Sequence, residues 1–376
     1  MSKPTIFIIG GTGAQGIPVI RGLVQDNAYA VRVLTRDPTS ARAQQLAALS
    51  PNVHLLRGTF TSDSDLRAGL TGAWGAYINI DGFACGEALE TFFTIRCYEL
   101  AVERGVRFYV HGNIDFYYKL SGYNPAYRCG HGDAKGRMWE WISAQGAADR
   151  RARGDAHMRV AALTTGPYMD MALSAATPMS PTIEDTGEEV LTWRLPLTGD
   201  GAVAHSSLDD CAYYARWLFD HHAEVDGMNL EAGIDHVHYR DVARAFEKVT
   251  GRRARYVDVD FETYFSPGGG MGEMAGEPTG YMVKRGGLGV MTVRENFTGW
   301  WNSWRASGGN RGLVKRDYAL LDEIYPGRTR DVEEFFGKEA EKAEREGRGT
   351  LWDVVTSGRA VLKSGEDGRH GGVGGN

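Results

Sequence analysis

The sequence is short of the features that would place it in several large classes. It has no apolar run long enough to cross a membrane, and its start, MSKPTIFIIG, lacks the layout of a signal peptide. It holds only four cysteines, with no CxxC pair, so we expect reduced thiols in a cytoplasmic protein. Positive charge is not in excess, because 42 Lys and Arg face 48 Asp and Glu, and the net charge of −6 argues against a nucleic-acid partner. At 376 residues the chain is long enough for two lobes.

Three kinds of catalytic site are also missing. The pairs His221-His222 and His236/His238 have no carboxylate or cysteine partners at ligand spacing, so we expect no metal site. No GxSxG motif marks a nucleophilic serine. The stretch 11–16 has P-loop spacing, but Ile17 stands where the lysine would be, which argues against nucleoside triphosphate cleavage.

What the chain does have is a strand, a glycine-rich turn and a helix in its first 24 residues. Thr5–Ile9 is β-branched and aromatic, and apolar residues at helical spacing follow from Ile17. The glycines between them have the spacing GxxGxxG, one residue wider at the front than the GxGxxG dinucleotide fingerprint. Such a turn brings backbone N–H groups and a helix N-terminus to one point, which attracts a diphosphate. The residues that we expect to bind it are Gly10, Thr12, Gly13, Ala14, Gln15 and Gly16.

The end of the second strand indicates which cofactor is bound. Strand 31–35 ends at Arg36, where an NAD-binding fold has an acid for the ribose 2′-hydroxyl. A cation there suits a 2′-phosphate, with Thr39 and Ser40 as nearby hydroxyl donors. Asp37 is one residue away and could reach the ribose instead, so the sequence favours NADP(H) over NAD(H) without excluding the latter.

Strands and helices then alternate, which predicts an α/β fold with a Rossmann-type, doubly wound parallel sheet. We expect further strands at 53–57, 76–80, 106–110 and 158–164, helices at 87–104 and 132–145, and a polar surface loop at 147–155. Ligands bind beyond the carboxyl ends of such strands, which places 81–83 and 111–113 beside the cofactor.

The regular alternation of strands and helices ends after Asp170, where we expect a second, smaller α+β lobe to begin. We assign 1–170 to the cofactor domain, with 203–223 returning to it, 171–360 mainly to a substrate lobe, and 364–376 to a disordered tail. The stretch 266–289 holds nine glycines and is either a mobile cover or a plain surface loop. Phe297, Trp300, Trp301 and Trp304 fall at helical spacing, which more often indicates a core than a binding site.

Together these residues resemble the NmrA-like family, an atypical branch of the short-chain dehydrogenase/reductase superfamily. The segments that carry the resemblance are IFIIGGTGAQG at 6–16, LTRDP at 34–38, HGDAK at 131–135, GPYMD at 166–170 and the fungal-type DYALLDEIYPGRTRDVEEF. It runs to about Phe336 and is specific for the family but not for a substrate.

The resemblance implies NADP(H) at the carboxyl edge of the sheet and a small-molecule substrate facing the second lobe. It adds Thr59, Ile80, Asp81, Lys135, Tyr168 and Met169 to the expected cofactor contacts. Catalytic reductases of the superfamily use Ser, Tyr and Lys. Here His131 replaces the tyrosine, Gly112 occupies the serine position, and Lys135 is kept and is expected at the nicotinamide ribose.

Two functions therefore remain open. One is an NADPH-dependent oxidoreductase of fungal secondary metabolism, such as alkaloid biosynthesis, in which imine or iminium chemistry ranks slightly above ketone reduction. Its candidate catalytic residues are Lys135, His131, Asp115, Asp81 and Tyr168. The other is a non-catalytic NADPH sensor that binds a protein partner. The resemblance includes this function, because several NmrA-like proteins that lack the catalytic tyrosine and serine act in this way.

Overall fold

The computed structural model describes residues 3–185, 187–280, 282 and 290–363. They form two compact units that interleave along the chain. The first, the sheet unit, comprises residues 1–116, 131–164 and 208–232, and the second comprises 117–130, 165–207 and 233–376. The tail at 364–376 lies outside the described residues.

The sheet unit is built on a seven-stranded sheet in the order β10-β6-β5-β4-β1-β2-β3. The five neighbouring pairs among β1 to β6 are parallel. The order reverses beside β1, which is the switch point where doubly wound sheets bind ligands. The strands are β1 (Thr5–Ile9), β2 (Ala30–Thr35), β3 (Val53–Arg57), β4 (Gly75–Ile78), β5 (Phe108–Asn113), β6 (Arg159–Thr165) and β10 (Asn229–Ala232). The predicted α/β fold is confirmed.

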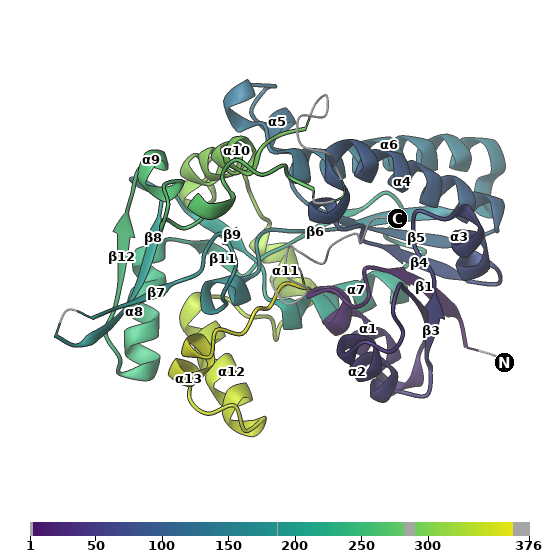
Figure 1. Ribbon diagram of the computed structural model, residues 1–376. Helices are drawn as coiled ribbons and strands as arrows, with labels where there is room; N and C mark the ends of the chain where they lie inside the picture. Colours follow the sequence, from purple (N-terminus) through teal and green to yellow (C-terminus); the bar gives the residue numbers. More distant parts are fainter. Residues whose placement is uncertain (1–2, 186, 281, 283–289, 364–376) are drawn as a thin grey trace, which may run out of the picture. The chain divides into compact units, whose positions relative to one another are not determined.

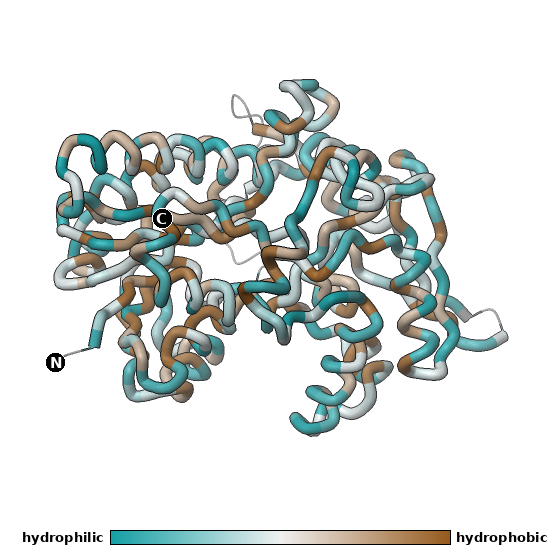
Figure 2. Tube along the Cα trace, turned by 180° about the vertical axis from the view of Figure 1, so that it is seen from behind, coloured by the Kyte–Doolittle hydropathy of each residue, from teal (hydrophilic) through white to brown (hydrophobic). Residues whose placement is uncertain are grey.

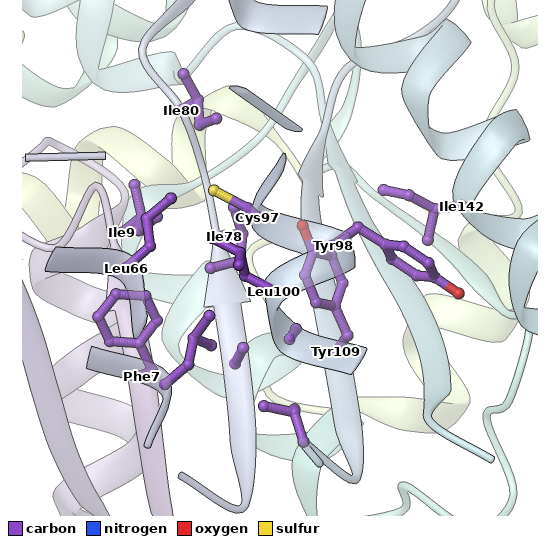
Figure 3. Close-up of a cluster of buried hydrophobic side chains, with 14 of the residues drawn as sticks. Phe7, Ile9, Leu66, Ile78, Ile80, Cys97, Tyr98, Leu100, Tyr109 and Ile142 are labelled. Atoms are coloured by element: carbon purple, nitrogen blue, oxygen red, sulfur yellow. The ribbon is translucent and has the colours of Figure 1, made fainter. Parts of the chain in front are cut away.

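Helices cover both faces of this sheet (Figure 1). One layer holds α3 (Asp63–Leu70), α4 (Gly82–Glu103) and α6 (Gly130–Arg153), and the other holds α1 (Gly16–Val24), α2 (Ala41–Leu49) and α7 (Leu208–Asp220). Figure 3 shows the core beneath the first layer, where Phe7 and Ile78 of the sheet meet Leu66 of α3 and Leu100 of α4. All four side chains are essentially buried, so this face is a continuous apolar core.

Helix α7 returns to the sheet unit from far along the chain and packs against α1. The Cα of Gly22 lies so close to α7 that an added Cβ would be 2.3 Å from the carbonyl oxygen of Ala212. Arg21 pairs with Asp209, and the Tyr29 hydroxyl donates to Asp220 at 2.8 Å. Small residues and flanking polar pairs therefore fix this close helix contact.

Several boundaries differ from the sequence prediction, and those of α6, β5 and α4 bear on the site. The segment 147–155 is not a surface loop, because α6 continues to Arg153 and η3 (Gly154–Ala156) follows. Its polar residues stabilise the helix from its exposed face, since the Arg153 guanidinium donates to Asp149 at i,i+4. Strand β5 runs to Asn113, so residues 111–113 belong to the strand. Helix α4 starts at Gly82, with a break at Gly86 (φ 72°, ψ 169°) before its regular part.

The second unit contains two small sheets. One has the order β12-β8-β7, and the other pairs β9 with β11 in antiparallel fashion. Their strands are β7 (Thr182–Asp185), β8 (Glu189–Leu195), β9 (Val203–His205), β11 (Asp235–Val237) and β12 (Ala254–Asp258). The helices of this unit are α5 (Tyr117–Leu120), α8 (Tyr239–Thr250), α9 (Phe261–Tyr264), α10 (Val293–Arg305), α11 (Tyr318–Ile324), α12 (Val332–Arg345) and α13 (Leu351–Thr356), and its short 3-10 turns include η2 (Pro125–Tyr127), η4 (Met169–Leu173) and η5 (Gly272–Met274). Hydrophobic and hydrophilic residues are interspersed along the chain in both units (Figure 2).

Helix α10 forms the aromatic core of the second unit. Phe297, Trp300, Trp301 and Trp304 are all at most 3% exposed, so they are core residues. The same helix holds the segment 117–130, because Asn302 donates to the Ala126 carbonyl at 2.8 Å. The glycine-rich stretch is described only at 266–280 and at 282, where it forms turns.

Two further observations concern the described residues as a whole. None of their helices has the length and apolarity needed to span a membrane. The four cysteines are buried and form no disulfide within the described chain.

Candidate functional site

The glycine-rich turn is fixed by close backbone packing at two of its glycines. Gly10 has φ of +83°, and an added Cβ would lie 2.3 Å from the Asn79 carbonyl oxygen. A Cβ on Gly16 would lie 2.1 Å from the carbonyl oxygen of Gly10. Only glycine fits at either position, so these two residues set the path of the turn.

Gly13 differs, because an added Cβ would meet only the Gly10 carbonyl oxygen, at 3.1 Å, and nothing else within 4 Å. One face of the turn is therefore open beside the first residues of α1. The first turn of α1 has no acidic residue to offset the positive end of the helix dipole. Open space next to a helix N-terminus fits the diphosphate of a dinucleotide.

At the end of β2, Asp37 is engaged within its own turn. Its Oδ1 accepts hydrogen bonds from the backbone N–H of Thr39 at 2.9 Å and from its hydroxyl at 2.6 Å. Ser40 caps α2 by accepting from the N–H of Ala43. Arg36 is exposed, and its guanidinium makes no hydrogen bond or ion pair in the part of the chain that the structure describes. The guanidinium is thus better placed than Asp37 to receive a ligand.

A polar network joins the turn to the end of β4. The Gln15 Oε1 accepts from the Tyr77 hydroxyl at 2.8 Å and from the Asn79 Nδ2 at 2.7 Å. The Asn79 Oδ1 in turn accepts from the Lys135 ammonium at 3.1 Å. The Gln15 side chain thus links the glycine turn to Tyr77 and Asn79, and its predicted contact with the cofactor stays a prediction.

Lys135 lies at the centre of this network and is buried. Its ammonium also donates to the Ile80 carbonyl at 2.6 Å and pairs with Glu90 Oε1 at 2.7 Å. An ammonium has three N–H donors, and the three acceptors here account for all of them. A ribose hydroxyl would have to share or displace one of these partners. Sequence reasoning missed Asn79 and Glu90, and only their polarity beside apolar neighbours in β4 and α4 could have indicated them.

The other residues at the end of β5 are largely internal. His111 is buried and its Nε2 donates to the Lys135 carbonyl at 3.3 Å. Burial, together with the Lys135 ammonium, lowers the pKa of His111 to about 3, so its ring is neutral. Asn113 is 4% exposed and donates to Thr164 at 2.7 Å, while its Oδ1 accepts no hydrogen bond within the described chain.

The predicted acids and the histidine occupy different settings around this edge. Asp81 is exposed and caps α4 by accepting from the N–H of Phe83 at 3.0 Å. Asp115 is buried two residues beyond β5. His131 is buried on α6, with its ring 4.7 Å from that of Phe83. Thr59 lies beyond β3, where its N–H donates to Asp65.

Tyr168 and Met169 belong to the second unit, in the turn that follows β6. Tyr168 forms an isolated bridge with Ser206, and the Met169 N–H donates to the Ser206 carbonyl at 2.9 Å. Buried His205 supports this turn by donating from Nδ1 to the Pro167 carbonyl at 3.1 Å. The roles predicted for Tyr168 and Met169 stay predictions.

Comparisons with known proteins agree with this geometry. The family model described as "NmrA-like family" matches residues 2–121 and 151–277. The oxidoreductase hkm9 of Aspergillus hancockii, which carries an NmrA-like domain, is 26% identical over 277 residues, covering 70% of this chain and 78% of its own.

Two solved structures share the fold. NmrA, a negative transcriptional regulator solved with NADP, has a TM-score of 0.66 at 18% identity, covering 94% of this chain and 99% of its own. The quinone oxidoreductase QOR2 of Escherichia coli, solved with NADPH, has a TM-score of 0.60 at 17% identity, covering 88% of this chain and 98% of its own.

Proposed function

The chain belongs to the NmrA-like family, and on that premise we propose that it is an NADP(H)-dependent oxidoreductase acting on a small, largely apolar metabolite. The observation that carries the proposal is the open face at Gly13 beside the uncompensated N-terminus of α1. The match to hkm9, a fungal oxidoreductase, supports the enzymatic assignment.

Three groups of the sheet unit would each contact a different part of the cofactor. The turn around Gly13 would hold the diphosphate through its backbone. Arg36 would hold the 2′-phosphate, since a guanidinium can make two parallel hydrogen bonds to phosphate oxygens. The unpartnered Oδ1 of Asn113 is an acceptor at the carboxyl edge of the sheet and suits an amide N–H. When bound, NADPH would supply the hydride.

For the reaction we propose reduction or cyclisation of an imine or iminium, as in fungal alkaloid metabolism. Ketone reduction needs a proton donor to the developing alkoxide and a clamp on the carbonyl oxygen. Position 131 has no phenol and position 112 has no hydroxyl. An iminium already carries positive charge, so positioning and a negative field are sufficient. We assign that field to the carboxylate of Asp81 or Asp115. His131 or Tyr168 would donate or accept protons before or after the bond-forming step.

A panel of imines and ketones, assayed for NADPH consumption and for cyclised products, tests this proposal. We expect turnover of imines and a loss of activity in Asp81→Asn or Asp115→Asn. Glu99→Gln is a matched control, because Glu99 is an exposed carboxylate on α4 that pairs with Arg96. Turnover of ketones alone, unaffected by either Asp→Asn variant, would reject the imine assignment.

The alternative is a cofactor-sensing regulator whose output is contact with a protein partner. The saturated ammonium of Lys135 favours it, since a lysine with three internal acceptors is poorly placed to assist catalysis. Tight NADPH binding with no turnover of any compound in the panel would support the sensor.

A further inference from the structure

Glu90 is an acidic residue in the middle of α4, yet its side chain is 1% exposed. Apart from its contact with the Lys135 ammonium, neither carboxylate oxygen has a hydrogen-bond partner within the described residues. The Cα of Gly82 covers the second oxygen, since an added Cβ there would lie 2.3 Å from Oε2. The carboxylate is therefore enclosed by protein and depends on a single cation.

Such a pair is not explained by stability. Removing a carboxylate from water is costly, and desolvation accordingly raises the pKa of Glu90 while Lys135 opposes the rise. Buried ion pairs are often no more stabilising than apolar residues of the same volume. The other two Lys135 partners, Asn79 and Ile80, already fix the position of the ammonium. Glu90 is therefore not needed to position the ammonium, and its contribution is a negative charge beside it.

That charge lies at the edge where the cofactor is expected. Asn79 and Ile80 directly follow β4, next to the switch point of the sheet, and Asn79 is bonded to Gln15 of the glycine turn. A lysine without a counter-charge at this edge would place a full positive charge near the nicotinamide. The nicotinamide ring is cationic in NADP⁺ and neutral in NADPH, so such a lysine would weaken the oxidised form selectively.

We propose that Glu90 is a positioning residue that cancels the charge of Lys135 and thereby lets the site hold NADP⁺ about as well as NADPH. This proposal rests on the proposed NADP(H) site. It makes Glu90 a determinant of the preference between the two oxidation states of the cofactor rather than of overall affinity.

The test is the ratio of dissociation constants for NADP⁺ and NADPH, measured by calorimetric titration of the whole chain. A change that weakens the binding of both cofactor forms equally, such as a distorted glycine-rich turn, leaves this ratio unaltered. In Glu90→Gln the ammonium loses the carboxylate that it contacts, and only the more distant Asp81 carboxylate still opposes its charge, so we expect the ratio of the NADP⁺ constant to the NADPH constant to rise about tenfold. In Glu90→Gln with Lys135→Gln both charges are gone, and the ratio should return to the parent value.

Glu99→Gln is the matched control. Glu99 is a half-exposed carboxylate further along α4 that pairs with Arg96, so its loss removes a negative charge from the same helix. Its ratio should equal that of the parent. If Glu90→Gln does not fold, as judged by thermal denaturation, Glu90→Asn and Glu90→Asp give the same comparison, and Asn should show the higher ratio.

An unchanged ratio in Glu90→Gln, or equal weakening of both forms, would overturn the proposal and leave Glu90 a structural residue. A parent that binds neither form would overturn the proposed function instead. The two failures are therefore distinguishable.

Discussion

The side chain of Asn79 occupies the space that a side chain at position 112 would need. A Cβ on Gly112 would lie 2.6 Å from the Asn79 Cβ and 2.7 Å from its Cγ. Asn79 cannot easily move aside, because it is bonded to both Gln15 and Lys135. The absence of a serine at 112 is thus part of the packing of this site.

We expect Gly112→Ser to destabilise the protein rather than restore a catalytic hydroxyl. Overpacking at such a site costs about 1–3 kcal/mol, and a displaced Asn79 would loosen the turn held by Gln15. Thermal denaturation and NADPH titration should both show a loss. Gly337→Ser is the control, since a Cβ there meets nothing within 4 Å. A Gly112→Ser variant as stable as the parent would contradict the role given to Asn79.

Gly13→Val and Gly16→Ala should fail in different ways. A side chain on Gly13 projects into the open face of the turn, so we expect NADPH binding to be lost while stability stays within about 1 kcal/mol of the parent. A Cβ on Gly16 would collide with the backbone at Gly10, so that variant should lose stability itself. Calorimetric titration and denaturation separate the two effects. If Gly13→Val binds NADPH like the parent, the diphosphate lies elsewhere.

Arg36→Ala should weaken NADPH binding about tenfold or more and leave NADH binding nearly unchanged, because only NADPH offers a 2′-phosphate to the guanidinium. The measurement is the affinity for both cofactors. Arg104→Ala removes a surface arginine at the end of α4, paired with Glu103, and should change neither value. Equal affinity of the parent for NADPH and NADH would reject this assignment.

His111 should make the protein sensitive to acid. Its pKa is about 3 in the folded protein and near 6.5 when unfolded, so the folded state binds fewer protons. The stability that it contributes is therefore full above about pH 6.5 and is lost as the pH falls from there towards 3.

Urea denaturation of the parent and of His111→Gln between pH 7.5 and 5 tests the predicted loss of stability at lower pH. As the pH falls below 6.5, the unfolding free energy of the parent should decrease relative to that of His111→Gln by about 1.4 kcal/mol per pH unit. Buried His205, whose pKa burial lowers to about 4, contributes equally to both proteins and cancels in the difference. A difference that does not vary with pH would show that His111 keeps an ordinary pKa.

The local part of the fold was predictable from the sequence, and the long-range pairs were not. The strand, turn and helix at residues 5–24 follow from periodicity and glycine spacing, and they match β1 and α1. The segment 147–155 was mistaken for a loop because its charges were taken for a break, whereas they form the exposed face of α6.

The same limit applies to the candidate site. Lys135 could be found from the resemblance of HGDAK at 131–135 to the family motif, but Glu90 lies on another helix, and no local pattern links the two. Asn79 likewise follows an ordinary strand sequence, and its contacts with Gln15 and Lys135 exist only after the sheet has formed. Pairings between distant segments therefore had to come from the structure.

The late return of α7 has a consequence for synthesis on the ribosome. Arg21 and its partner Asp209 are 188 positions apart, and α1 has no α7 to cover it until that stretch has been translated. At about 5–20 residues per second, roughly ten to forty seconds pass between the two helices. During that time the face of α1 at Gly22, which meets the backbone of Ala212 in the folded chain, is uncovered in the nascent chain. A chain cut short before α7 should accordingly be a target for chaperones and aggregation, even though it contains the whole glycine turn.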